Sequence, residues 1–169
     1  MTDRLRLAYA DPPYLGCAHL YPEHPDAGRW DDPAAHAELI AELESGYDGW
    51  ALSMSAKSLP ALAPFTPAGA RIAAWVKPFA AYKRNVRIAY TWEPLMVKPA
   101  RMSSTTGALV TRDHLSAPIA TRRGLTGAKP EVFCRWVLAL LGYLEGDDVT
   151  DMFPGTGIMG AITRQTALA

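Results

Sequence analysis

The chain has 169 residues, 49% of them hydrophobic and 20% charged, which fits one globular domain large enough to bury a core of its own. No stretch reaches the ~20 unbroken apolar residues of a membrane span, and the N-terminus lacks the apolar region and cleavage site of a signal peptide. Two cysteines, Cys17 and Cys134, are too few for a disulfide framework. We therefore expect a cytoplasmic protein with no membrane partner.

The net charge is zero, but the charges are unevenly placed along the chain. Residues 71–129 carry eleven Lys or Arg and two acidic residues, whereas both flanking segments are acidic. This basic segment is either a solvated face or a surface for a polyanion such as a nucleic acid. Within it, cations alternate with flat rings, as in proteins that bind single strands. The residues of this pattern are Lys83, Arg84 and Arg87 with Tyr82, Tyr90 and Trp92.

The first predicted element is a strand at residues 5–10. It leads into DPPY, residues 11–14, where two prolines form a stiff, extended exit because they fix φ and donate no backbone hydrogen bond. Asp11 and Tyr14 are held on either side of this spacer, so we expect the loop to present a carboxylate and an aromatic ring. Residues 15–31 show no period and are predicted to be a long loop.

Helices and strands alternate in the middle of the chain. Asp32 is a predicted N-cap with Pro33 in the first helical turn, and Gly46 follows the end of this helix. Strands are predicted at residues 50–54 and 71–76, with a short helix at residues 55–63 between them. Two apolar runs follow, at residues 86–92 and 94–98. The two apolar runs flank Glu93 and form strands or a hairpin.

Residues 99–128 are rich in Ser, Thr, Gly and Arg and are predicted to be a mobile loop or a small insertion. Pro130 then opens a helix with apolar residues at helical spacing. A strand at 149–153 follows, and then a last helix. Strands that alternate with helices in this way predict an α/β domain with a largely parallel sheet.

A second loop of interest, DMFPGTGIMG at residues 151–160, lies between that strand and the last helix. Gly155 and Gly157 let the backbone approach a ligand closely, and the helix presents free N–H groups there. The loop is neither a Walker A motif, which needs Gly-Lys-Ser/Thr, nor a full dinucleotide fingerprint. Ligands of open α/β sheets bind at the carboxyl ends of strands, where this loop is expected to lie.

Together, DPPY and DMFPGTG resemble the amino-group DNA methyltransferases that use S-adenosylmethionine. The order, with the catalytic loop first and the cofactor loop last, resembles the circularly permuted β class of N6-adenine and N4-cytosine enzymes. Two further segments support the resemblance, TGAKPEVFCRWVL at 126–138 and the stretch from WVKP to PLMVKP at 75–99. The resemblance implies a single domain, residues 1–169, with a permuted, Rossmann-like α/β methyltransferase fold. Residues 99–128 would be a variable basic loop or a reduced target-recognition region.

The resemblance also implies the chemistry of the site. Asp11 and the Pro12 carbonyl would accept hydrogen bonds from the two N–H groups of the target amino group, which localises the lone pair of its nitrogen. Tyr14 would stack on the extruded base. The catalytic motif is then Asp11, Pro12, Pro13 and Tyr14. The S-adenosylmethionine site corresponds to Thr126, Lys129, Pro130, Asp151, Phe153, Gly155, Thr156 and Gly157. Contacts to DNA phosphates are expected from Lys83, Arg84, Arg87, Arg101, Arg112, Arg122 and Arg123.

The sequence departs from the family after the cofactor loop, where the family has further strands and this chain has one helix. Either the sheet lacks these C-terminal edge strands, or a homodimer or partner subunit completes it. We expect a DNA adenine-N6 methyltransferase of a bacterium or phage, since the cytosine enzymes more often carry serine in place of Asp11. The alternatives are a catalytically silent methyltransferase-like subunit that binds nucleic acid, or an enzyme acting on cytosine N4 or on RNA.

Two other chemistries are disfavoured by the cysteines and histidines. Methylation at carbon 5 of cytosine needs a cysteine nucleophile, in that family after a proline, and neither cysteine of this chain follows one. Cys134 lies in an apolar helix and is interpreted as a small buried hydrophobe. Cys17, His19 and His24 form one loose group without a complete set of ligands, so no metal is expected.

Overall fold

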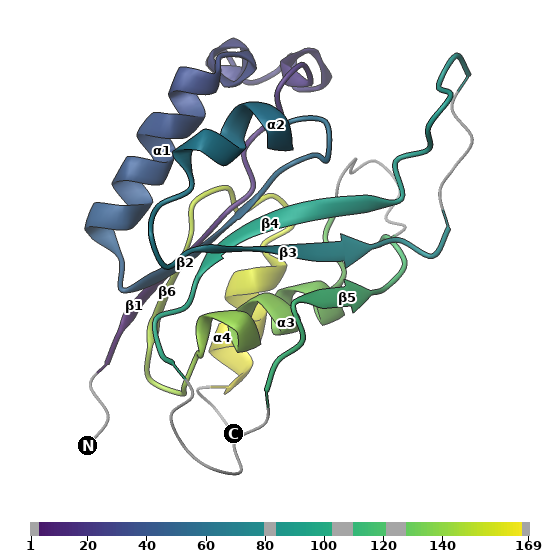
Figure 1. Cartoon of the computed structure of the whole chain (residues 1–169). Helices are drawn as coiled ribbons and strands as arrows, with labels where there is room; N and C mark the ends of the chain where they lie inside the picture. The colour runs from purple at the N-terminus through teal and green to yellow at the C-terminus, as the bar shows by residue number, and fades with distance from the viewer. Residues whose placement is uncertain (1–3, 80–83, 103–109, 121–127, 167–169) are drawn as a thin grey trace.

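The computed structural model describes residues 4–79, 84–102, 110–120 and 128–166 (Figure 1). Its six-stranded sheet has the order β5-β3-β4-β2-β1-β6. The strands are β1 (Arg6–Ala10), β2 (Gly49–Ser53), β3 (Arg71–Val76), β4 (Trp92–Lys98), β5 (His114–Ser116) and β6 (Asp148–Asp151). The helices are α1 (Pro33–Gly46), α2 (Leu59–Leu62), α3 (Glu131–Leu141) and α4 (Ile158–Thr166), with short 3-10 helices η1 (Ala18–Leu20), η2 (Ala27–Asp31) and η3 (Ala63–Phe65).

The sheet is mixed rather than largely parallel. β1 pairs in parallel with β2 and β6, and β3 with β5, whereas β4 runs antiparallel to both of its neighbours. The described part of the connection from β3 to β4 contains no helix, and the chain returns directly, as antiparallel strands allow. The carboxyl ends of five strands and the amino end of β4 therefore lie together. We call this the carboxyl end of the sheet.

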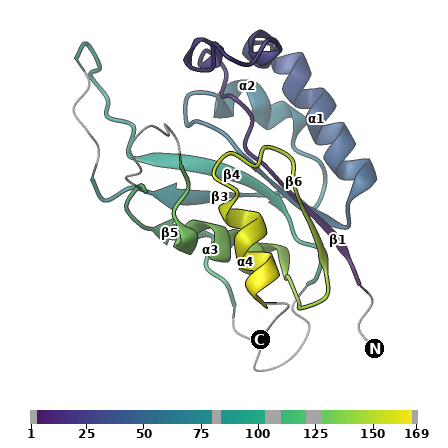
Figure 2. The same ribbon diagram turned by 180° about the vertical axis from the view of Figure 1, so that it is seen from behind.

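Helices cover both faces of the sheet, with α1 and α2 on one face and α3 and α4 on the other (Figures 1 and 2). Successive residues of a strand point to opposite faces. Accordingly, Ala8 of β1 belongs to the apolar core under α1, and Leu7 belongs to the core under α3 and α4. All five residues of β2 are buried, as expected for a strand that is covered on both sides.

The start of α1 confirms the predicted N-cap. The Asp32 carboxylate accepts a hydrogen bond from the backbone N–H of Ala34 at 2.9 Å, and Pro33 is the first helical residue. Gly46 is the last residue of α1 rather than the residue after it, because Tyr47 leaves the helix in an extended conformation.

Two predictions about the elements are corrected. Glu93 lies inside a single strand, β4, and residues 86–91 form no strand. A strand of three residues, β5, lies within the segment predicted to be a loop or insertion, and three residues are too few to show a period. Among the described residues, no helix is long and apolar enough to cross a membrane.

Candidate active site

The parallel pairing of β1 with β6 brings the two loops identified in the sequence together. Asp11 follows the last residue of β1, and Asp151 is the last residue of β6, in register with Tyr9. Glu93 lies at the amino end of β4, and Lys129 precedes α3. All of these residues therefore lie at the carboxyl end of the sheet, where ligands of α/β sheets bind.

A cluster of charged and phenolic groups surrounds Asp11. We call it the charge cluster and define it as Asp11, Tyr14, Lys77, Glu93 and Lys129. The Lys129 ammonium lies 2.9 Å from the Asp11 carboxylate, 3.0 Å from the Tyr14 hydroxyl and 3.5 Å from the Glu93 carboxylate. The Tyr14 hydroxyl is 2.9 Å from Glu93 and 3.1 Å from Asp11, and Lys77 is ion-paired with Glu93.

The charge cluster is largely buried, and charged neighbours offset the effect of burial on the pKa values of Lys129 and Glu93. Burial alone would lower the pKa of Lys129, but the carboxylates of Asp11 and Glu93 outweigh burial and raise it. Burial likewise disfavours an ionised Glu93, yet Lys129 and Lys77 hold its pKa below the ordinary value. Burial, followed by the charges of Asp11 and Glu93, raises the pKa of Tyr14 well above its ordinary value. The phenol therefore stays protonated and can donate.

Aromatic rings enclose the Lys129 side chain, which is 8% exposed. Its ammonium nitrogen lies 5.4 Å from the centre of the Tyr14 ring and 5.9 Å from the rings of Trp75 and Phe133. Such rings attract a cation through their negative faces and exclude water from it. The position of Lys129, and with it the orientation of the Asp11 carboxylate, is therefore fixed from several sides.

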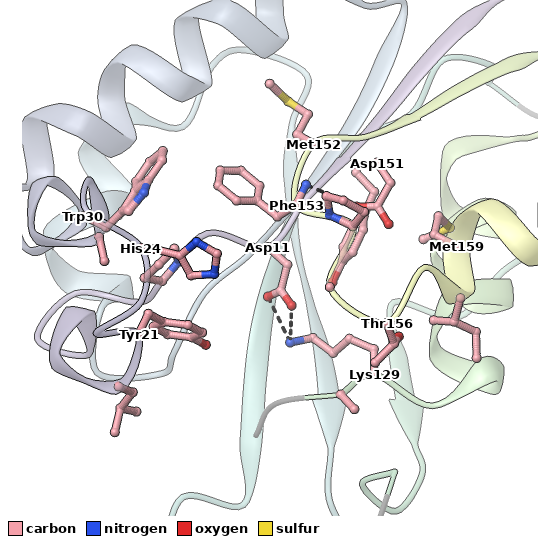
Figure 3. Close-up of a pocket in the computed structure, with 18 of the residues that line it drawn as sticks. Asp11, Tyr21, His24, Trp30, Lys129, Asp151, Met152, Phe153, Thr156 and Met159 are labelled. Carbon is pink, nitrogen blue, oxygen red and sulfur yellow. Dashed lines mark hydrogen bonds and ion pairs between the residues drawn. The ribbon is translucent and has the colours of Figure 1, made fainter. Parts of the chain in front are cut away.

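A cavity of about 700 Å³ lies beside the charge cluster, a size typical of small-molecule sites. Asp11 and Lys129 lie between two walls (Figure 3). Asp151, Phe153 and Thr156 belong to the wall formed by the β6–α4 loop. The opposite wall comes from the segment after DPPY and includes Tyr21, His24 and Trp30.

The β6–α4 loop has the geometry expected of a ligand-binding turn. Gly155 and Gly157 have φ values of 42° and 69°, a region that side chains with a Cβ rarely adopt, and α4 begins at the next residue. Burial raises the pKa of Asp151, although its carboxylate accepts a hydrogen bond of 3.3 Å from the backbone N–H of Phe153. Asp151 is thus a half-buried acid that a positively charged ligand group would stabilise.

The predicted catalytic and cofactor residues fall into four groups by their position relative to the cavity. Those that line the cavity are Asp11, Pro13, Lys129, Asp151, Phe153, Gly155 and Thr156. Pro12 is buried beside them, and Tyr14 belongs to the charge cluster but not to the cavity lining. Pro130 and Gly157 flank the lining as the residue before α3 and the residue before α4. Thr126 lies outside the described residues.

Several residues of the site were missed by reasoning from the sequence. They are Tyr9, Tyr21, His24, Trp30, Lys77 and Cys134, together with a role for Glu93. A carboxylate within an otherwise apolar strand was a usable sign for Glu93, because a buried acid needs a partner. Tyr21, His24 and Trp30 gave no such sign, since their segment has no period.

The predicted phosphate contacts are divided between the two ends of the sheet. Arg84 and Arg87 are exposed on the β3–β4 connection, which projects from the carboxyl end of the sheet (Figure 1), and Arg112 is exposed before β5. Arg101 lies at the opposite end, where its guanidinium is bound to the Asp147 carboxylate at 2.5 Å and 2.9 Å. Its position does not support the predicted phosphate contact. Lys83, Arg122 and Arg123 lie outside the described residues.

Fold and cavity together define an α/β protein with a cavity at the carboxyl ends of adjacent parallel strands. No family model matches the sequence, and no curated protein matches it. Among solved structures, the chain is similar to the M1.HpyAVI–SAM complex with a TM-score of 0.56 and 16% identity, over 96% of this chain and 78% of the other. It is similar to a further M1.HpyAVI structure with a TM-score of 0.61 and 16% identity, over 97% and 78%. This likeness confirms the predicted α/β methyltransferase type of fold.

Proposed function

We propose that this protein transfers a methyl group from S-adenosylmethionine to the exocyclic amino group of a nucleic-acid base, with adenine N6 in DNA as the favoured target. One observation carries the proposal: DPPY and the β6–α4 loop, which follow adjacent parallel strands, line one cavity. M1.HpyAVI, which shares the fold, is a DNA methyltransferase and has been crystallised with SAM, which is S-adenosylmethionine.

The residues present fit S-adenosylmethionine. Asp151 is half-buried without a cationic partner among the described residues, and the amino group of a methionine would supply one. The glycine turn and the start of α4 leave space and backbone donors next to Thr156. We infer that Asp151, Phe153, Gly155, Thr156 and Gly157 hold the cofactor with Lys129 and Pro130, and Thr126 belongs to the same proposal. The cofactor supplies an electrophilic methyl group on a sulfonium.

The chain itself would prepare the nucleophile. The Asp11 carboxylate and the Pro12 carbonyl would accept hydrogen bonds from the N–H groups of the target amino group. The lone pair of the amino nitrogen would then be available to attack the methyl group. A carboxylate has about four acceptor positions, so Asp11 can bind the substrate without releasing Lys129. Lys129 stays protonated because its pKa is raised, and so it orients Asp11 rather than acting as a base. The remaining contribution is alignment of nucleophile and methyl group.

The surface at the carboxyl end of the sheet supports a nucleic acid as substrate. Arg84 and Arg87 are exposed on the connection that projects from this end, and Arg112 is exposed before the amino end of β5. We infer that they contact phosphates together with Lys83, Arg122 and Arg123. Among the described strands, β6 pairs with β1 alone and lies at the edge of the sheet. We also propose that β6 pairs with a second copy of this chain or with a partner subunit. We expect the protein to act inside a bacterial cell, from a bacterial or phage gene.

The direct test is transfer of labelled methyl from S-adenosylmethionine to single-stranded DNA, double-stranded DNA and RNA. The parent is compared with Asp11→Ala and with Asp113→Ala, which removes an exposed acid away from the cavity. We expect label on adenine N6, a loss of about a hundredfold or more in kcat for Asp11→Ala, and parent activity for Asp113→Ala.

Other outcomes would revise the proposal in defined ways. Label on cytosine N4 or on RNA would correct the acceptor and keep the class of reaction. Binding of S-adenosylmethionine and DNA without transfer would identify a silent subunit. Absence of S-adenosylmethionine binding by calorimetry would overturn the proposal.

A further inference from the structure

The wall of the cavity opposite the β6–α4 loop contains none of the residues proposed to hold S-adenosylmethionine. It is formed by the segment 18–31, which contains η1 and η2 and which we call the strap. Tyr21, His24 and Trp30 of the strap lie on one side of Asp11, and Asp151 and Thr156 lie on the other side (Figure 3). The Asp11 carboxylate therefore lies between the two walls of one cavity, and we call the part of the cavity beside the strap the strap compartment.

The strap is a fixed wall, held by hydrogen bonds at both of its ends. The Asp31 carboxylate accepts hydrogen bonds from the backbone N–H groups of Gly16 and Ala18 at 2.8 Å and 3.2 Å, which closes the segment into a loop. The buried His36 of α1 bonds to the carbonyl of Trp30 at 2.9 Å. The Trp30 ring also meets the Phe153 ring edge to face, with centres 5.3 Å apart.

Three tyrosines lie near Asp11, and they differ in what they can offer a ligand. Tyr9 is 3% exposed, and its hydroxyl is hydrogen-bonded to Ser53. The hydroxyl of Tyr14 is engaged by Glu93 and Lys129, and Tyr14 is absent from the residues that line the cavity. Tyr21 lines the cavity and is half-buried. Burial, followed by the charge of Asp11, raises its pKa, which reflects its proximity to the proposed catalytic carboxylate. The ring available beside Asp11 is therefore Tyr21.

We propose that the strap compartment is the subsite for the acceptor base, with the Tyr21 ring as its stacking surface and His24 beside it. This inference rests on the proposed function. Methyl transfer needs the amino nitrogen in line with the methyl group, with the orienting carboxylate beside them. A base on the strap side and a methyl group on the side of the β6–α4 loop would meet next to Asp11. Stacking on an aromatic ring is how single bases are held outside a duplex. In this chain the role expected for Tyr14 passes to Tyr21.

The test separates binding of the base from binding of the cofactor. Tyr21→Ala and Tyr21→Leu remove the ring, Tyr21→Phe keeps it, and His19→Ala is a matched control on the strap that does not line the cavity. The probe is an adenine-rich single-stranded oligonucleotide with 2-aminopurine at one adenine, whose fluorescence is quenched by stacking. The affinity for S-adenosylmethionine is measured by calorimetry, and thermal unfolding reports whether each variant folds.

We expect Tyr21→Ala and Tyr21→Leu to weaken oligonucleotide binding about tenfold and to lose the quench, with unchanged cofactor affinity. Tyr21→Phe and His19→Ala should behave like the parent. Weakened cofactor binding with unchanged oligonucleotide binding would overturn the inference, because the strap would then hold the donor. A quench that persists in both ring-deleted variants would overturn it as well. A parent that fails to bind S-adenosylmethionine but shows the Tyr21-dependent quench would overturn the proposed function alone.

Discussion

Lys129 is the residue on which the geometry of the site depends. It is 8% exposed and connects the carboxylate after β1 with the carboxylate of β4. A buried ion pair contributes little net stability when it is complete, but removal of one partner leaves an uncompensated charge. Without Lys129, Glu93 would keep its ion pair with Lys77, and Asp11 would have no ion-pair partner among the described residues.

We predict that Lys129→Met moves the acid limb of the activity profile to higher pH. Without the ammonium, Asp11 and Glu93 repel each other, so that one of them keeps its proton at higher pH and Asp11 is a weaker acceptor. Lys129→Met should also lower the free energy of unfolding by about 3 kcal/mol. The measurements are kcat/KM against pH and urea denaturation, with Lys129→Arg as the variant that keeps the charge. Parallel pH profiles, displaced by a constant factor, would contradict the proposed role.

The sign of the pH effect on the parent follows from the two pKa shifts. The raised pKa of Lys129 contributes stability that is complete below its unfolded value and is lost as the pH rises through the folded value. The lowered pKa of Glu93 contributes stability that is complete above its unfolded value and is lost as the pH falls through the folded value. The charge cluster is therefore held together over the neutral range.

The sequence predicted the DPPY motif and the glycine turn of the β6–α4 loop, but not the contacts that Lys129 and Glu93 make in the charge cluster. DPPY and the glycine turn are short motifs whose chemistry is local, since proline and glycine fix the backbone wherever they stand. The contacts of Lys129 with Asp11 span 118 positions, and those of Tyr14 with Glu93 span 79. They depend on strand order, which a single sequence does not reveal. Tyr21 was missed because its segment has no period, so that nothing in the sequence indicated that this segment folds back beside Asp11.

Among the elements, the ion pair of Asp147 with Arg101 connects the amino ends of β1 and β6 to the turn after α3. The Asp147 carboxylate accepts hydrogen bonds from Arg101 and from the backbone N–H groups of Leu5 and Leu144. Arg101 also donates to the carbonyl of Gly142. This tie lies at the opposite end of the sheet from Asp11 and holds the strands in the register that aligns their carboxyl ends.

We predict that Asp147→Asn lowers the free energy of unfolding at neutral pH by about 1–3 kcal/mol, because a charge-assisted bidentate pair becomes neutral. The hydrogen bond from Arg101 is the largest influence that lowers the pKa of Asp147, to about 2 from an ordinary 3.8. The stability it contributes is complete above the ordinary pKa and is lost as the pH falls towards 2. The parent and the variant should therefore converge in acid. Urea denaturation across this range is the measurement, with the exposed Asp113→Asn as control, and a constant difference at every pH would contradict the mechanism.

The elements themselves were predictable to the extent that their burial is periodic. α1 was predicted with its N-cap, and β3 with its ends, because apolar and capping residues stand at regular positions. β4 was divided at Glu93 in the prediction, because an acid for the charge cluster breaks the apolar run. β4 runs antiparallel to β3, and the described part of their connection, residues 77–79 and 84–91, contains no helix. The sequence of this connection did not indicate the direction of β4.

In the molecule as a whole, the exposed arginines of the β3–β4 connection indicate that a polyanion would approach the carboxyl end of the sheet. The chain is neutral, yet Arg84, Arg87 and Arg112 are exposed, and the β3–β4 connection that carries the first two projects from the same end of the sheet as the cavity. Arg71 begins β3 and is exposed at the opposite end. The two ends of one sheet thus offer a matched pair of sites for testing whether position, rather than charge alone, determines binding.

We predict that Arg84→Ala with Arg87→Ala weakens binding to single-stranded DNA and reduces its dependence on salt. Each lost phosphate contact should reduce the slope of log K against log salt concentration by about 0.7, because fewer counterions are released on binding. Arg71→Ala removes one positive charge, half of what the double variant removes, from the far end of the sheet and should leave the slope unchanged. The measurement is fluorescence anisotropy of a labelled oligonucleotide over a range of salt concentrations. Equal slopes in the parent and in the double variant would show that the β3–β4 connection does not contact the phosphates. An equal effect of Arg71→Ala would show that the protein attracts DNA through its overall field and not at the carboxyl end of the sheet.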